Sequence, residues 1–440
     1  GDCKPFTIGL YAGMSVTPNK VKGQRANTED TAEYALRHWK TKGKLPPSSN
    51  PIQIMQCPWC GCNLKPNNHE LQFSDSFGDT PVERRAKLIA KCGNNFCDFS
   101  REAIPYQTVD ETLYSEPPSM LVGTVDKFAQ LAFNDHIGRL FGWTQGKRTM
   151  SPPNLIIQDE LHLINGPLGS LVGLYESTID YLSSDDVKVE INGDKPLHEI
   201  SPSDILSVKT KSKAKIIASI ATIRNADRQC KGLYDRSTFR FPPSGTNISD
   251  SFFVKTKEEY DKDKAYFGVL CSGVGAKTTI KSVTTDILRK ISTHREEGVD
   301  LQAYDPFWTI VSYYNSMKEL GGSVTLLRDD IRTNVQEFRE SIRNENAIGE
   351  LHGGLSSTDL PDVLRRLQLN AEQRNPYDVV TCSNMFSVGV DVDRLGLMLM
   401  NSQPKATTEY LQATGRVGRG MAGLVAVLFN QARPRDQSHF

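Results

Sequence analysis

The stretch YDVVTCSNMFSVGVDVDRLGLMLMNSQPKATTEYLQATGRVGR, residues 377–419, decides the fold class of this chain. It contains two short apolar runs, YDVVTC and LGLMLM, separated by the glycine-containing turn SVGVD. Neither run alternates strictly between apolar and polar residues, which favours strands buried on both faces of a parallel sheet. The stretch therefore predicts a strand, a turn and a second strand of an α/β sheet, followed by the arginine-rich motif QATGRVGR.

Similar apolar runs recur along the whole chain. Between several of them lie helix-like stretches, such as residues 167–184 and 358–373. This alternation is typical of βαβ units and predicts doubly wound parallel sheets, one near each end of the chain. The predicted strands of the two sheets are FTIGLYAG, SMLVGTV, PNLIIQD and AKIIASIA, then WTIVSYY, YDVVTCS, LGLMLMN and GLVAVLF.

The strand pattern predicts two domains. The first covers residues 1–290, with an insertion at about 50–105, and the second covers residues 307–440. A charged stretch at residues 291–306 is expected to connect them. The chain opens on glycine inside an apparent strand, so we expect both domains to be parts of a longer protein.

Composition restricts the class of protein. Lysine plus arginine and aspartate plus glutamate both number 52 among 440 residues. No global basic field draws the chain to nucleic acid, so a nucleic-acid site must be a local groove. The sequence has no apolar run of about 18 residues and no leader pattern, and we expect a cytoplasmic protein.

Five of the nine cysteines crowd into residues 57–97. They form two knuckles, CPWCGC at 57–62 and CGNNFC at 92–97. Four thiolates in two close pairs can hold Zn²⁺ in the closed tetrahedral geometry of structural sites. The expected ligands are Cys57, Cys60, Cys92 and Cys97, with Cys62 as an alternative.

An acidic pair follows the third predicted strand, in PNLIIQDELHLINGP. Carboxylates at the carboxyl end of a parallel strand lie where α/β sheets bind ligands. There Asp159 can hold Mg²⁺ through its water shell, and Glu160 can act as a general base on a water molecule. The small residues of SIAT, at 219–222, end the next predicted strand and suit a turn that couples two sites.

Two arginines, Arg416 and Arg419, lie three residues apart near the end of the chain, each beside a glycine. A guanidinium group presents a planar fork of donors that matches phosphate oxygens, and glycines let a ligand or a backbone approach closely. This pattern indicates a polyphosphate site, although an isolated GRxGR also fits a basic turn.

The ordered set of motifs resembles that of the superfamily 2 helicases, which have two RecA-like domains that close on ATP. DELH resembles their motif II, SIAT motif III, SVGVD motif V and QATGRVGR motif VI, while LVGTVDKFAQL resembles motif Ib. The resemblance covers most of the chain outside the insertions. It implies two RecA-like domains, with a zinc-binding insertion in the first.

The resemblance also implies roles for individual residues. Arg419 is the expected arginine finger, and Gln412 and Arg416 would reach the same phosphates. His162 would couple the acidic centre to motif III or VI, although a histidine satisfied within the core is the competing interpretation. Gly389 and Asp391 would close around the ribose of ATP. A nucleic-acid track would be lined by Thr124, Lys127 and His352.

A narrower resemblance points to the large helicase of the DISARM anti-phage system. The phrases that carry it include IIQDELHLINGPLGSLVGLYES, PFWTIVSYYNSMKELGG, ELHGGLSS and RPRDQSHF. It implies DNA as the nucleic acid and a protein partner with a DUF1998 domain.

The chain departs from the helicase pattern in one respect, because it contains no P-loop of the form GxxxxGK[ST]. In CSGVGAKTT, Cys271 and Ala276 replace the two required glycines, and the stretch follows DELH instead of preceding it. We expect the missing motifs upstream of Gly1 and little ATP hydrolysis by these residues alone. The alternative is a non-catalytic nucleic-acid-binding or scaffold subunit derived from a helicase core.

Overall fold

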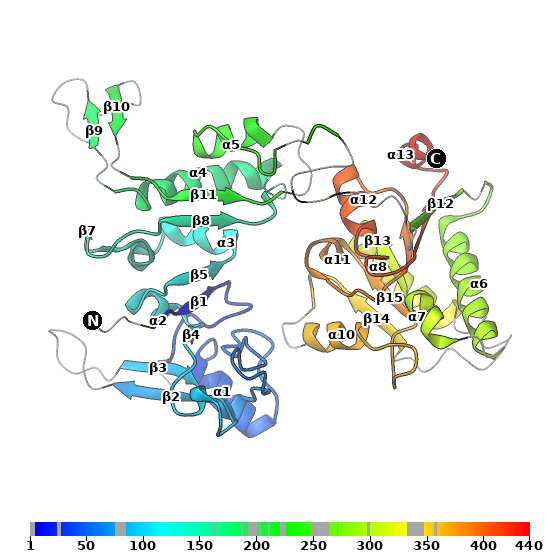
Figure 1. The fold of residues 1–440 in the computed structure, drawn as a ribbon, viewed down its shortest axis with the longest axis horizontal. Helices are drawn as coiled ribbons and strands as arrows, with labels where there is room; N and C mark the ends of the chain where they lie inside the picture. Colours follow the sequence, from blue (N-terminus) through cyan, green and yellow to red (C-terminus); the bar gives the residue numbers. More distant parts are fainter. Residues whose placement is uncertain are drawn as a thin grey trace. The chain divides into compact units, whose positions relative to one another are not determined.

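The computed structural model describes most of the chain as two compact units, Gly1–Arg240 and Phe241–Phe440 (Figure 1). It describes all residues except 1–4, 24–27, 75–84, 162–163, 165, 186–187, 192–200, 202–203, 210–211, 221–225, 244, 248–252, 254, 256–263, 271, 297–299, 332–346 and 356–358. Each unit contains parallel strands covered by helices.

In the first unit, five parallel strands pair in the orders β4-β1-β5 and β11-β8. All four strands predicted for this part of the chain are confirmed. The strands are β1 (Ile8–Tyr11), β4 (Tyr106–Gln107), β5 (Met120–Gly123), β8 (Leu155–Gln158) and β11 (Lys215–Ala218).

Alternate residues of these strands face two different environments. Leu121 and Ile156 pack inward against the helices, in the same cluster as Tyr11 and Ile179. The next residues along the strands point the other way, and Ile157, for example, is 63% exposed. Parallel sheets are ordinarily covered on both faces. Here the described residues cover only one face of these strands. The covering helices are α2 (Asp110–Ser115), α3 (Val125–Phe128), α4 (Gly166–Leu182) and α5 (Ala226–Tyr234), with the 3₁₀ helices η3 (Ala129–Ala132) and η4 (Asp135–Phe141).

The first unit also contains smaller elements outside the parallel strands. Helix α1 begins at a cap in which Thr31 accepts from the Tyr34 amide, and it ends at Gly43 in a left-handed conformation. Strands β2 and β3 form the antiparallel hairpin that carries the cysteine knuckles. The elements are α1 (Ala32–Lys42), η1 (Pro66–Asn68), β2 (His69–Ser74), β3 (Arg85–Ala90), η2 (Asp98–Ser100), and the hairpins β6 (Trp143–Thr144) with β7 (Lys147–Arg148) and β9 (Lys188–Ile191) with β10 (Ile205–Lys209).

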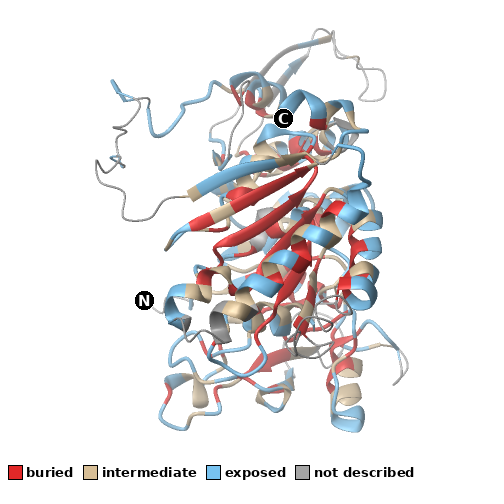
Figure 2. Ribbon diagram, turned by 90° about the vertical axis from the view of Figure 1, so that its right-hand side faces the viewer, coloured by how far each residue is buried: buried red, intermediate tan, exposed pale blue. Residues whose placement is uncertain are grey.

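The second unit is built on a six-stranded parallel sheet of order β12-β17-β16-β13-β15-β14. Val380, Val311, Met398 and Val425 lie side by side on four neighbouring strands, and all are fully buried. Figure 2 shows the central strands coloured as buried. The strands are β12 (Lys264–Leu270), β13 (Ile310–Tyr314), β14 (Ile348–Leu351), β15 (Val379–Cys382), β16 (Leu397–Asn401) and β17 (Gly423–Phe429).

Helices cover both faces of this sheet. Leu367 of α10, Phe386 of α11 and Ala413 of α12 share one core cluster, whereas Leu288 of α6 and Leu327 share the other. The predicted doubly wound arrangement is therefore confirmed here. The helices are α6 (Ala276–Glu296), α7 (Leu301–Trp308), α8 (Met317–Leu326), the π-helix η8 (Leu327–Ile331), α10 (Leu360–Leu367), α11 (Asn384–Gly389), α12 (Thr407–Thr414) and α13 (Pro434–His439).

The second unit also contains elements that the sequence analysis placed elsewhere. Strand β12 and helix α6 precede residue 307, yet β12 pairs with β17 along its whole length. The division of the structure thus falls at residue 240, earlier than the predicted boundary near 290. The predicted connecting stretch at 291–306 contributes to α6 and α7 instead. Among the described residues, none of the helices is both long and apolar enough to cross a bilayer.

A buried ion pair ties α3 to α2 in the first unit. Lys127 Nζ lies 2.6 Å from Asp110 Oδ2 and donates to Asn19 Oδ1 at 3.0 Å. Both charged side chains are almost fully buried. Burial raises the pKa of Asp110, and the neighbouring Lys127 opposes this shift. Each charge is therefore tolerated in the core only because the other is present.

We expect Lys127→Ala to lower the free energy of unfolding of the first unit by about 3–5 kcal/mol, because it leaves Asp110 buried without a cation. The double variant Lys127→Met/Asp110→Leu should recover most of this loss. Urea unfolding followed by tryptophan fluorescence measures it, since three of the four tryptophans lie in the first unit. Lys40→Ala, on the exposed side of α1, is the matched control. A Lys127→Ala variant as stable as this control would contradict the prediction.

Glu176 of α4 is a second buried carboxyl group, only 8% exposed. Gln158 donates to Glu176 Oε1 at 3.3 Å, but burial dominates and raises the pKa of Glu176 from 4.5 to about 7. A carboxyl group whose pKa is raised by folding favours the folded state while it is protonated, and this contribution is lost as pH rises through the folded pKa.

As pH rises from about 4.5 to about 7, Glu176 should therefore lower the stability of the first unit by on the order of 1–3 kcal/mol. In Glu176→Gln, the amide stays neutral and this contribution to the slope should disappear. Urea unfolding of both proteins across this pH range isolates the effect of Glu176 as a difference. Identical pH profiles for the two proteins would refute it.

Candidate nucleotide and metal sites

The DELH motif begins where β8 ends. Asp159 is exposed at the carboxyl end of the strand, and its Oδ1 accepts a hydrogen bond from the Glu160 amide at 3.0 Å. Glu160 has φ 53°, a left-handed conformation that a residue with a side chain adopts at a cost. Such a conformation persists only where its surroundings hold it, so the contacts around Glu160 define this site. His162, the last residue of the motif, lies outside the described residues.

The SIAT motif supplies one of these contacts. Strand β11 pairs with β8 in parallel, which places Ser219 beside Asp159 at the same end of the sheet. Ser219 Oγ donates to Asp159 Oδ1 and also accepts from the Glu160 amide at 3.3 Å. The carbonyl oxygen of Ser219 accepts from the Leu161 amide at 3.0 Å. The two motifs are therefore joined through one serine, while Ala221 and Thr222 lie outside the described residues.

Motifs V and VI meet within the second unit. Arg419 Nη1 donates to Asp391 Oδ1 in an ion pair, and Arg419 Nε donates to the Gly415 carbonyl at 3.2 Å. Arg416 Nη1 donates to the Val390 carbonyl at 3.0 Å. Both arginines of QATGRVGR are thus tied to the SVGVD segment. Gln412 is half-buried in the last turn of α12, and Gly389 is the last residue of α11.

The glycines of QATGRVGRG have a packing role. Gly418 has φ +65°, and a Cβ atom there would lie 2.7 Å from the Gly423 Cα. The side chain of Lys264 from β12 lies beside both glycines, and its Nζ donates to the Thr414 carbonyl at 3.1 Å. Burial and the nearby Arg419 both lower the pKa of Lys264. The Lys264 side chain therefore packs against the loop that carries Arg416 and Arg419, called here the arginine loop.

Lys264 and β12 were missed by the sequence analysis. The run AYFGVL at residues 265–270 was a usable signal, since it has the same apolar character as the predicted strands. Its pairing with β17 spans about 160 residues of sequence, and no local pattern indicates which strand it joins.

The three predicted nucleic-acid residues occupy different environments. Thr124 is exposed at the start of α3. His352 Nδ1 accepts from the Gly354 amide at 3.1 Å, and its Nε2 lies 3.8 Å from Glu350. Lys127 is 3% exposed, and its ammonium group is occupied by Asp110 and Asn19. In this conformation Lys127 does not offer its charge to a phosphate.

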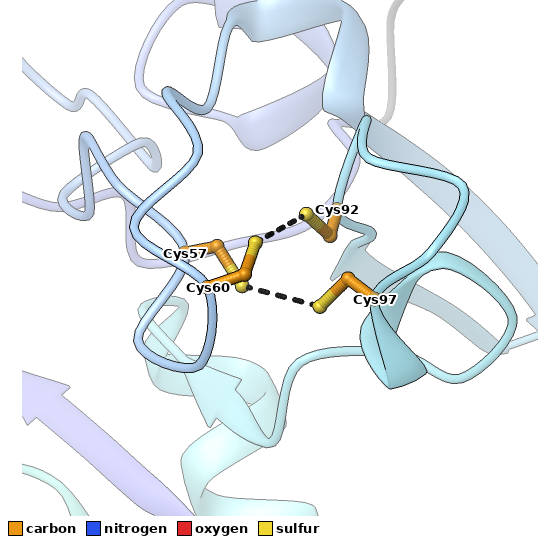
Figure 3. A group of neighbouring side chains, drawn as sticks. All are labelled: Cys57, Cys60, Cys92 and Cys97. Atoms are coloured by element: carbon orange, nitrogen blue, oxygen red, sulfur yellow. Dashed lines mark hydrogen bonds between the residues drawn. The ribbon is translucent and has the colours of Figure 1, made fainter.

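The four predicted zinc ligands converge in the first unit (Figure 3). Cys57 Sγ lies 3.8 Å from Cys97 Sγ, and Cys60 Sγ lies 3.5 Å from Cys92 Sγ. All four sulfur atoms lie within 4.8 Å of one another. Zn–S bonds of about 2.3 Å in a tetrahedron separate sulfur atoms by about 3.8 Å, so the cluster fits a Zn²⁺ ion.

The knuckle backbones are shaped for this convergence. Gly61 has φ +71°, which closes the turn after Cys60. The backbone amide of Cys62 lowers the pKa of the Cys60 thiol to about 7, whereas the pKa values of the Cys92 and Cys97 thiols are raised within the same cluster. The Cys62 thiol itself donates to the Asn63 carbonyl and is not one of the four converging ligands. A closed set of four sulfurs leaves no position for substrate, which is typical of structural metal sites.

Comparison with known proteins places these sites in a family. Residues 310–421 match the family model "Helicase conserved C-terminal domain". The chain is 36% identical to the DISARM protein DrmA of Bacillus paralicheniformis, over 99% of this chain and 39% of that protein. It is also 27% identical to the ATP-dependent DNA helicase RecQ of Pasteurella multocida, over 28% of this chain and 20% of that protein.

Among solved structures, the chain is similar to the DUF1998 helicase MrfA bound to DNA and AMPPNP. The TM-score is 0.48 with 16% identity, and the match covers 75% of this chain and 37% of that one. The chain thus spans about two fifths of the length of the DrmA and MrfA proteins it matches. The second unit therefore contains a helicase C-terminal domain of superfamily 2, and the chain is a homologue of DrmA.

Proposed function

We propose that the complete protein is an ATP-dependent DNA helicase or translocase that acts in bacterial anti-phage defence. The observation that carries this proposal is the meeting of Asp159, Glu160 and Ser219 at the carboxyl ends of β8 and β11. That arrangement suits phosphate chemistry, and the identity to a DISARM protein supports the defence role. Because the chain spans only 39% of the length of DrmA, we propose ATP hydrolysis for the complete protein.

In this proposal Asp159 holds Mg²⁺, which would neutralise phosphate charge, and Glu160 orients and deprotonates the attacking water. Ser219 fixes the Asp159 carboxylate, since it donates to Oδ1. His162 couples the centre to motif III or VI.

Arg419 acts in this proposal as the arginine finger from the second unit, with Gln412 and Arg416 contributing to phosphate binding. In the described conformation Arg419 is paired with Asp391. To reach a phosphate, Arg419 must therefore break its ion pair with Asp391. The arginine–carboxylate hydrogen bond is then replaced by an arginine–phosphate hydrogen bond, which is also charge-assisted. Gly389 and Asp391 would then be free to close around the ribose.

For the nucleic-acid track we propose Thr124 and His352, which contact the strand through phosphate and sugar. Such contacts carry no base information, and we expect little sequence preference. The role that the structure supports for Lys127 is to hold α3, and so Thr124, in place through Asp110.

The four-cysteine cluster is proposed to bind one structural Zn²⁺ ion. The spacing of the sulfur atoms supports this metal. Thiolates remain available in a reducing compartment, which agrees with a cytoplasmic location. A partner protein with a DUF1998 domain remains a prediction from the family resemblance.

Arg419→Ala in the full-length protein should lower nucleic-acid-stimulated ATP turnover on the order of a hundredfold or more, with a smaller change in ATP affinity. Glu160→Gln should abolish turnover while ATP still binds. Arg365→Ala, an exposed arginine on α10, is the matched control. Steady-state ATPase assays with and without DNA test this. Near-normal turnover by Arg419→Ala would refute its role as an arginine finger and leave the motif as a basic turn. Absence of turnover in the full-length wild type would instead favour a non-catalytic DNA-binding or scaffold protein.

Metal analysis of the reduced protein should find about one zinc per chain. Cys92→Ser should lose the metal and Cys62→Ser should keep it, because only Cys92 belongs to the converging set. Chelation should increase hydrogen exchange in residues 55–100 and leave the strands of both sheets protected. Zinc-free wild-type protein, or loss of metal in both variants, would overturn the assignment.

A further inference from the structure

Gln229 contacts the DELH loop from helix α5. Its Nε2 donates to the carbonyl oxygen of Ile164 at 3.0 Å and to that of Leu161 at 3.3 Å. Leu161 is fully buried and Ile164 is 8% exposed. The loop that follows Glu160 therefore depends on one side chain for two of its backbone acceptors.

Helix α5 also packs against this loop through apolar side chains. Leu161 and Ile164 share a core cluster with Cys230 and Tyr234 of α5 and Val172 of α4. Ser219 directly follows β11, and α5 is the next described element along the chain. The residues after β8 are thus held on one side by Ser219 and on the other by Gln229.

Between these two contacts lies Glu160 in its left-handed conformation. A backbone in this region returns to a commoner conformation unless neighbouring contacts prevent it. Ser219 fixes the amides of Glu160 and Leu161, while Gln229 fixes the carbonyls at Leu161 and Ile164. The direction of the Glu160 side chain is therefore set jointly by the end of β11 and by α5.

We propose that Gln229 is a positioning residue for Glu160, through which helix α5 controls the geometry of the attacking water. This inference rests on the proposed function. Gln229 touches no reacting atom; it acts through the backbone that carries the general base. A neutral amide suits the task because its NH₂ group offers two donors to two carbonyl oxygens.

The test uses Gln229→Met and Gln229→Glu in the full-length protein. Methionine keeps the length of the side chain without a donor, and glutamate turns two oxygen acceptors toward two carbonyls. We expect turnover to fall on the order of tenfold to a hundredfold, because small displacements of a reacting group cost rate more than binding. The affinity for ATP should stay within about twofold, and the loss should be larger for Gln229→Glu.

Two controls separate positioning from loss of stability. Cys230→Ala removes a buried side chain of the same helix without removing a donor to the loop, and Arg228→Met changes an exposed side chain of α5. Both should retain turnover at temperatures where each variant is folded. If Cys230→Ala loses as much turnover as Gln229→Met at matched stability, Gln229 is merely structural and the inference fails.

The outcome is distinguishable from failure of the proposed function. Loss of turnover in Glu160→Gln establishes that the site hydrolyses ATP. If that loss is seen and Gln229→Met and Gln229→Glu turn over like the wild type, only the positioning role of Gln229 is refuted.

Discussion

The parallel pairing of β8 with β11 is the constraint on which the first-unit site depends. Parallel strands end at the same edge of a sheet, and this register places the residues after Gln158 beside those after Ala218. This register is sufficient to bring Ser219 within hydrogen-bonding distance of Asp159. The unusual backbone of Glu160 is tolerated because hydrogen bonds from both sides fix it. The left-handed backbone and its fixing contacts therefore lie at Glu160, the residue proposed to act as the general base.

In the second unit, close backbone packing fixes the loop that carries Arg416 and Arg419. Gly418 and Gly423 approach so closely that neither position accommodates a side chain without displacement of its neighbour. This contact, with Lys264 beneath it, fixes the loop from which Arg416 and Arg419 project. The ion pair with Asp391 then holds Arg419 in a defined place while keeping it partly exposed. A surface ion pair of this kind contributes little to stability and is easily exchanged, which suits a residue proposed to move onto phosphate.

The cysteine module depends on a different kind of stabilisation. Its hairpin and knuckles bury a small cluster that includes three of the thiols and few large apolar side chains. Small modules of this kind commonly rely on a metal cross-link because their apolar core is limited. The module nevertheless continues into the main sheet, since β3 is followed by β4 and β4 pairs with β1. The cysteine cluster is thus connected to the β4-β1-β5 strands, whereas DELH follows β8 of the β11-β8 pair.

Sequence alone determined the features that depend on local patterns. The eight apolar runs are strands, the four cysteines converge, and residues 167–182 form a helix, because each follows from short-range periodicity or spacing. The order of the motifs by itself indicates the helicase family. Tertiary structure alone decided which distant residues meet. The burial of Lys127 against Asp110, the pairing of Arg419 with Asp391, the support from Lys264 and the Gln229 contact all join residues far apart in the chain. No local pattern specifies such pairs, because they follow from strand order and register, which are set by the packing of the whole sheet.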